Sequence, residues 1–226
     1  MRGAAAVACI MTMAAAATKA WSLPRSLGEG AWRFTVVSLA GFSPWACAGG
    51  WLHARLGEGG LYAVSTLAFL AAAALLLPPV LPPPHRQRRL LRFFVPAFVV
   101  YAVVWCGCWF ALGAGRGEWL GAALGGAMFV LITGTLLGRP ASWSLAVIVF
   151  VLAHAAGYAV GGQAMHLLAG GGRPGSLAML AWGGCYGLGF GAGLGYLIHA
   201  CLCSGTAVTE HPPDDTGPPS TIAEES

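Results

Sequence analysis

The chain has 226 residues, of which 57% are hydrophobic and 9% are charged, with 12 Lys and Arg against 8 Asp and Glu. A soluble domain carries about 25% charged residues, so the composition excludes an ordinary soluble globule and indicates a protein that lies mainly in lipid. The seven cysteines form no C-x-x-C pair of the kind that zinc sites use, and most lie in apolar runs. They are interpreted as small hydrophobic residues and not as a disulfide framework.

Residues 1–20 combine one arginine with an alanine-rich apolar run that ends in small residues, which is the outline of a secretory signal. The single basic residue and the alanines are also consistent with a disordered or wrongly assigned start, or with an additional span. These three interpretations stay open. We therefore treat residues 1–30 as a separate N-terminal segment.

Six apolar stretches follow, and each is close to the ~20 residues that a helix needs to cross the hydrocarbon core. They lie at about 33–52, 60–81, 93–113, 119–137, 143–163 and 177–203. Tryptophans lie at or near their ends, where an indole prefers the headgroup region. These are Trp32, Trp51, Trp109, Trp119, Trp143 and Trp182. Residues 31–203 are therefore predicted to form an all-α polytopic membrane bundle of about six glycine-rich transmembrane helices.

The connection between the second and third stretches has a proline run followed by Arg86, Arg88, Arg89 and Arg92. By the positive-inside rule this connection is expected in the cytoplasm. Alternation of the spans then places nine of the twelve basic residues inside if Arg2 is retained, and three outside. We expect an integral protein of the bacterial inner (plasma) membrane with both termini in the cytoplasm, in contact with the lipid bilayer and its anionic headgroups.

The last 23 residues, 204–226, hold five acids, no Lys or Arg and two Pro pairs. This composition predicts a disordered acidic cytoplasmic tail. The excess of basic charge lies in the rest of the chain, where the arginines form no stripe with stacking aromatics. No nucleic-acid partner is expected.

Glycine spacing is regular in the sixth stretch. Gly183, Gly187, Gly191 and Gly195 recur every four residues and share one stripe of the helix. Small residues at this spacing let a neighbouring backbone approach closely, as in helix association within lipid. We predict that these glycines pack helices together inside the bundle. Contact with a second copy or with another membrane protein, and a pore lined by glycine, are the alternatives.

His154 is the one ionisable residue that clearly lies at membrane depth, because Glu29, Glu58 and Glu118 fall in connecting segments or at span ends. Burial of such a residue in lipid is costly, so it is a functional candidate by default. The lack of a carboxylate at mid-membrane argues against a proton- or sodium-coupled transporter and against a carboxylate general base.

Three interpretations of His154 stay open. It forms a structural hydrogen bond to a neighbouring helix, it is a residue inherited from a protease ancestor that no longer catalyses, or it binds a ligand or a proton. Tyr158, one turn further on the same face, is a candidate binding residue and an expected partner, as are Thr133 and Thr135 of the preceding stretch.

His199 is the other candidate binding residue. It shares a helix face with Cys203, and Cys201 lies beside them, which is a donor set that soft metals accept. A histidine near the membrane surface with two incidental cysteines explains the pattern without a metal. We therefore predict no metal site and no cofactor.

Phe150 and His154 match the F-x-x-x-H motif of one family of membrane enzymes, and residues 187–197 match its glycine-rich penultimate helix. Over residues 125–200 the chain thus resembles the CAAX-protease and bacteriocin-processing (CPBP, or ABI) intramembrane protease family. The resemblance implies a helical membrane fold and a catalytic role for the two residues.

The sequence departs from that family at its first motif, E-E-x-x-x-R. Met128 and Phe129 stand where the resemblance puts the two glutamates, and Thr133 stands in place of the arginine. Without a carboxylate to activate water, peptide hydrolysis has no general base better than one imidazole. The resemblance therefore implies a degenerate relative that has lost catalysis.

We predict a multi-pass integral membrane protein without catalytic activity, which acts as a scaffold or binds lipid or a protein partner. A small-solute channel or transporter is one alternative. An active intramembrane protease of the same family, with an unorthodox site, is the other.

Overall fold

The computed structural model describes residues 22–204, so the interpretations of residues 1–21 and of the tail from 205 lie outside the described residues. Within this part the chain is all-helical, and all five long helices have the length and apolar composition to cross a membrane. They are α2 (Leu23–Leu76), α3 (Arg86–Leu112), α4 (Arg116–Leu137), α5 (Trp143–Ala169) and α6 (Ser176–Cys203), and a short 3-10 helix, η1 (Pro78–Val80), follows α2.

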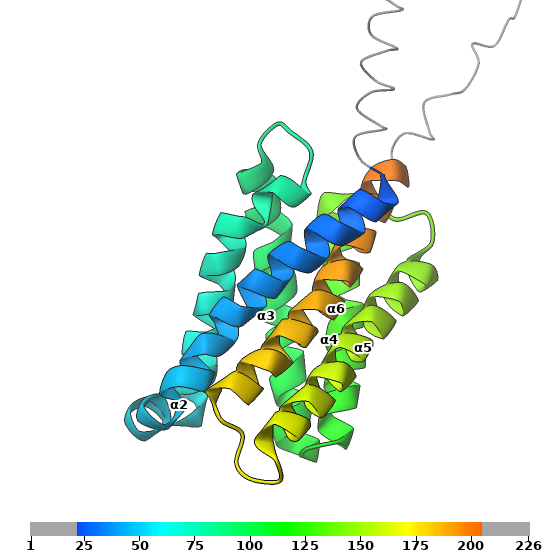
Figure 1. Cartoon of the computed structure of the whole chain (residues 1–226). Coiled ribbons are helices and arrows are strands. Elements are labelled where there is room, and N and C mark those ends of the chain that lie inside the picture. Colours follow the sequence, from blue (N-terminus) through cyan, green and yellow to red (C-terminus); the bar gives the residue numbers. More distant parts are fainter. Residues whose placement is uncertain (1–21, 205–226) are drawn as a thin grey trace, which may run out of the picture.

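Helix α2 reverses its direction at Gly57, whose φ of 69° and ψ of −177° are not helical. Glycine adopts a positive φ without steric cost. The two halves lie antiparallel, since the rings of Phe42 and Phe69 have centroids 5.5 Å apart, and Figure 1 shows the chain turning back. The first two predicted stretches fall one in each half, and the second half ends at Leu76, just before the prolines of η1.

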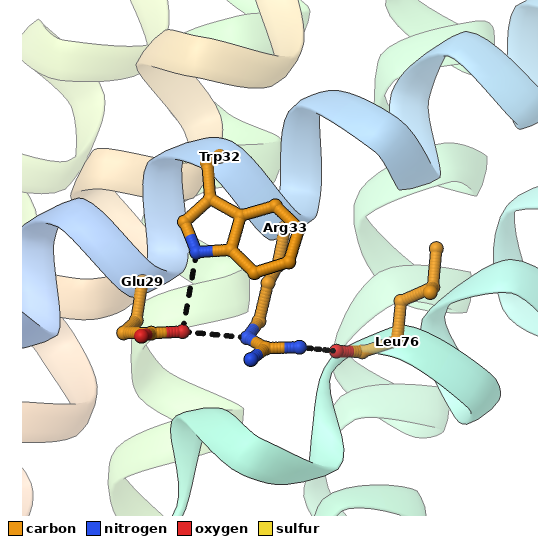
Figure 2. Close-up of polar contacts among 4 residues, drawn as sticks. All are labelled: Glu29, Trp32, Arg33 and Leu76. Atoms are coloured by element: carbon orange, nitrogen blue, oxygen red, sulfur yellow. Dashed lines mark hydrogen bonds and ion pairs between the residues drawn. The ribbon is translucent and has the colours of Figure 1, made fainter.

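An arginine ties the two halves of α2 together (Figure 2). Arg33 donates from Nε to Glu29 Oε2 at 2.7 Å and from Nη1 to the Leu76 carbonyl at 3.1 Å. The indole of Trp32 donates to the same Glu29 oxygen at 3.2 Å. A carbonyl in the last turn of a helix has no partner inside the helix, so Arg33 both satisfies Leu76 and neutralises Glu29.

The remaining helices begin near their predicted positions, except that α3 begins at Arg86 and not near 93. The helix therefore includes the arginines that were assigned to the preceding connection. Helix α5 continues to Ala169, six residues beyond its predicted end. Hydropathy marks the part of a helix that suits lipid, whereas long charged or polar side chains allow the helix to continue past that part.

Helix α6 lies between α2 and α5 (Figure 1). Phe190 of α6 is at the centre of an aromatic core, with ring centroids 4.4 Å from Phe34, 4.9 Å from Phe150 and 5.1 Å from Phe129. All four side chains are fully buried. A layer of aromatic rings thus joins α2, α4, α5 and α6.

The glycines of α6 lie where neighbouring backbones come closest. A Cβ added at Gly187 would be 2.6 Å from Ser38 Cβ in α2, and one added at Gly183 would be 2.8 Å from the Phe42 ring. Cβ atoms added at Gly191 and Gly195 would meet backbone atoms of α2. Gly189 and Gly193 form a second row on α6 that faces α5, because a Cβ at Gly189 would be 2.8 Å from Gly157 Cα and one at Gly193 would be 3.0 Å from the Phe150 ring. These contacts are within one copy of the chain.

The connections fall at two ends of the bundle. The terminal end holds the start of α2, the η1 connection, the α4–α5 connection and the end of α6 (Figure 1). The distal end holds the Gly57 turn and the connections at 113–115 and 170–175. Arginines at the terminal end are Arg25, Arg33, Arg86, Arg88, Arg89, Arg92 and Arg139, and those at the distal end are Arg55, Arg116 and Arg173.

Candidate functional site

A cavity of about 730 Å³ lies at the distal end of the bundle. All five long helices line it. Helices α2, α3, α5 and α6 each contribute residues three or four apart, which share one face of a helix, whereas α4 contributes Glu118. On α2 the lining runs from His53 near the turn down to Gly41, a rise of ~18 Å at 1.5 Å per residue. That depth is more than half of the ~30 Å hydrocarbon core of a bilayer.

Aromatic side chains form one continuous wall of the cavity. Trp182 of α6 is in its middle, with ring centroids 5.1 Å from Phe42, 5.7 Å from Trp45 and 5.1 Å from Tyr158. The three pairs are edge-to-face, an arrangement that rigid aromatic clusters prefer. Trp105 and Trp109 line the facing side on α3. The wall is therefore apolar and built from large, well-packed rings.

Charged groups lie near the mouth of the cavity. His53, Glu58 and Arg173 are exposed there, whereas Glu118, in the first turn of α4, is partly buried. Within residues 22–204 the one salt bridge joins Glu29 and Arg33 at the other end of the molecule. Glu58 and Glu118 thus line the cavity as carboxylates without an arginine or lysine partner in the described part of the chain.

Tyr101 and Tyr186 line the floor and connect the cavity to His154. The Tyr186 hydroxyl donates to the Tyr101 oxygen at 3.3 Å, and the Tyr101 hydroxyl is 3.0 Å from His154 Nε2. The Tyr101 oxygen thus joins the Tyr186 hydroxyl to one ring nitrogen of His154. Nδ1 has no hydrogen-bond partner among the described residues.

His154 itself does not line the cavity, because it is 0% exposed and lies behind Tyr101. The Tyr186 and Phe190 rings also pack against it, with centroids 5.2 and 5.6 Å away. Phe150, one turn earlier on α5, stacks on Phe129 at 5.0 Å as part of the aromatic core. The two residues of the F-x-x-x-H motif are thus both inside the packed bundle.

The prediction of hydrogen-bond partners for His154 is wrong. Tyr158 makes a ring contact with centroids 6.4 Å apart and no hydrogen bond to it. The Thr135 hydroxyl donates to carbonyls of its own helix, at Leu131 and Ile132, and Thr133 Oγ1 is buried without a partner in the described part of the chain. The hydrogen-bond partner is Tyr101 of α3, which is 53 residues away in the sequence. Tyr158 instead lines the cavity.

His199 lies at the terminal end, far from the cavity. Cys203 Sγ is 3.7 Å from both of its ring nitrogens, whereas Cys201 is buried. Residues 22–204 contain no group of three or more His, Cys, Asp or Glu side chains that could hold a metal ion. Among the described residues, the possible metal donors in contact with each other here are therefore the Cys203 thiol and the His199 imidazole.

The cavity was not predicted from the sequence, although the second half of α2 carries one pattern that indicates it. In the second half of α2, Glu58, Tyr62, Ser65 and Phe69 follow each other at three- and four-residue steps and all line the cavity. A stripe of polar and aromatic groups on an otherwise apolar span indicates a face turned away from lipid. The stripes of five separate segments become one site only when the bundle is assembled.

Comparison of the chain with protein-family models, with curated proteins and with solved structures found no match. The site is therefore interpreted from its own geometry.

Proposed function

We propose that this chain is a multi-pass integral protein of the bacterial inner membrane, which binds a small, largely apolar ligand in the distal cavity and does not change it chemically. Six crossings with both termini in the cytoplasm are part of the proposal. They are supported by the reversal of α2 at Gly57 and by the excess of arginine at the terminal end.

The observation that carries the proposal is the cavity. Small-molecule sites have volumes of roughly 300–1,000 Å³ and are lined mainly by apolar and aromatic groups with a few polar ones. The distal cavity has this size, an aromatic wall, two tyrosine hydroxyls at its floor and charged groups at its mouth. Its depth would bury most of the surface of a small ligand.

Burial of His154 supports a binding role over catalysis. A general base must come within hydrogen-bond reach of the proton that it takes, directly or through one water. The imidazole is fully buried, and its Nε2 is engaged with Tyr101. If the chain descends from the CPBP family, as its resemblance suggests, Phe150 and His154 serve the packed interior and an active protease is disfavoured.

Binding of a neutral fluorescent amine, N-phenyl-1-naphthylamine, tests the proposal. The protein is reconstituted in lipid nanodiscs, and energy transfer from tryptophan to the probe is measured. We expect saturable transfer, since four indoles line the cavity. The matched variants are Gly162→Leu and Gly107→Leu, because an added Cβ meets no atom within 4 Å at either site.

Gly162 lines the cavity, whereas Gly107 of α3 is exposed and does not line it. Gly162→Leu should therefore reduce the saturable signal, and Gly107→Leu should leave it as in the wild type. Equal signals in all three proteins, after subtraction of empty nanodiscs, would contradict a binding site in the cavity.

A small-solute carrier is the second candidate, because the cavity is reached from one end and its floor closes it towards the other. Below the floor, the aromatic core around Phe190 fills the bundle. Carriers that alternate access hold their substrate near mid-membrane in this way. Solute flux into proteoliposomes that is lost in Gly162→Leu and kept in Gly107→Leu would favour the carrier.

A further inference from the structure

Two of the three described carboxylates line the cavity. The structure describes three carboxylates, and Glu29 is neutralised by Arg33 at the terminal end. The other two, Glu58 and Glu118, both line the cavity, and Arg173 is the one arginine that does so. In a chain with an excess of basic residues, the lining of this cavity therefore carries two carboxylates and one arginine.

The same cavity offers the faces and edges of four indole rings and four phenol rings. Aromatic faces attract cations through their quadrupole, more strongly when the contact is desolvated than when it is exposed, and tryptophan attracts them most strongly. Trp45, Trp105, Trp109 and Trp182 come from three different helices and surround the cavity from facing sides. This arrangement suits a bulky cation with an apolar body.

We infer that the distal cavity is a site for a small organic cation, a quaternary ammonium or protonated amine joined to an apolar group. The inference rests on the proposed binding function and adds the class of ligand. The apolar group contacts the aromatic wall, and the cationic head lies towards Glu118, which is partly buried and therefore less screened than Glu58. An anion would meet two carboxylates and the negative faces of the rings, against the one arginine, Arg173, at the mouth.

Arg173 allows a test in the opposite direction, because its positive charge should repel a bound cation that the carboxylates attract. It is exposed in the connection between α5 and α6 and lines the mouth of the cavity. Loss of this charge should strengthen the binding of a cation, whereas loss of Glu118 should weaken it. A site selected only by shape would show neither effect.

The test compares benzyltrimethylammonium with its neutral carbon isostere, neopentylbenzene, and with the anion phenylmethanesulfonate. Binding to the full chain in nanodiscs of zwitterionic lipid is followed by tryptophan fluorescence and calorimetry. We expect the cation to bind about tenfold more tightly than the isostere, as one desolvated cation–π contact allows. The anion should not bind at the concentrations that saturate the cation.

The variants are Glu118→Gln, Arg173→Gln and, as a matched control of charge, Glu29→Gln. Glu118→Gln should weaken cation binding about tenfold, Arg173→Gln should strengthen it, and Glu29→Gln should leave it unchanged. Thermal unfolding shows which variants are folded, and the exposed Arg173 keeps the test valid if Glu118→Gln is unstable.

Equal binding of the cation and the isostere, with no response to Glu118→Gln or Arg173→Gln, would overturn the inference but leave the proposed binding function intact. No saturable binding of any probe, including N-phenyl-1-naphthylamine, would overturn both.

Discussion

At the residue scale, Tyr101 and Tyr186 line the floor of the cavity, and His154 lies buried behind Tyr101. The depth of His154 could be predicted by counting residues along an apolar helix. Its partner could not, because Tyr101 lies on another helix and only the packing of α3 against the bundle brings the two rings to a 3.0 Å contact. The hydrogen bonds from Tyr186 through Tyr101 to His154 hold three side chains in one arrangement beneath the aromatic wall.

Removal of the hydroxyl in Tyr101→Phe should lower the stability of the protein. It leaves His154 Nε2 and the Tyr186 hydroxyl without their partner, and interhelical hydrogen bonds in membranes contribute about 0.6 kcal/mol on average and up to ~1.7. Unfolding by SDS titration in mixed micelles measures the loss.

The matched control is Tyr196→Phe, which removes a hydroxyl from the same helix as Tyr186 but outside this network. A double-mutant cycle with His154→Phe isolates the Tyr101–His154 interaction. Additive effects of the two substitutions would show that the hydrogen bond does not contribute to stability.

At the element scale, α6 is the helix on which α2 and α5 pack. The spacing of its glycines was evident in the sequence, but the neighbouring helix was not, because spacing does not identify a partner helix. In the structure the row of Gly183, Gly187, Gly191 and Gly195 meets α2, and the row of Gly189 and Gly193 meets α5. The cavity wall of α6 is instead made by Met179, Trp182 and Tyr186.

The turn within α2 illustrates a second limit of sequence reasoning. Composition placed two spans on either side of residues 53–59, yet gave no geometry for the turn between them. Gly57 provides it through one positive φ, and the helix is otherwise continuous up to and after that residue. Arg33 then fixes the register of the two halves through Leu76.

Close packing of α6 predicts that Gly187→Ala destabilises the protein by roughly 1–3 kcal/mol, the usual cost of overpacking. The new Cβ would lie 2.6 Å from Ser38 Cβ and 2.7 Å from Thr35 Cα, so the helices must move apart. Gly184→Ala is the control, because its Cβ would meet only Leu39 Cδ2 at 3.8 Å.

Thermal unfolding in mild detergent compares the two variants with the wild type. If Gly187→Ala and Gly184→Ala unfold at the same temperature, the glycine row does not determine how closely α2 and α6 approach.

At the scale of the whole molecule, the uneven distribution of arginine could be predicted from the sequence, whereas the cavity could not. The asymmetry of arginine could be counted in the sequence, and the structure places seven of the described arginines at the terminal end. The cavity could not be predicted, because it is the space left between stripes on five segments that are far apart in the chain. The sequence places its two carboxylates, Glu58 and Glu118, in connecting segments or at span ends and does not indicate that they share a site.

The proposed topology predicts opposite locations for reporters inserted on either side of the second half of α2. Alkaline phosphatase fused after Glu58 should be active, since this enzyme folds only outside the cytoplasm, and green fluorescent protein fused after His85 should fluoresce, because it does so only inside. The reverse pattern would contradict the orientation, and the same location for both positions would contradict a crossing between them.

The central claim, a water-accessible cavity that opens at the distal end, is tested most directly by the reactivity of Gly162→Cys. A membrane-impermeant methanethiosulfonate reagent is added at the distal face, and mass spectrometry of peptides measures modification at position 162. Gly107→Cys, which has equal room but does not line the cavity, is the control. We predict that the thiol introduced at position 162 is modified and is protected by benzyltrimethylammonium, while the thiol introduced at position 107 stays unmodified. An unreactive thiol at position 162 in folded protein would contradict the claim.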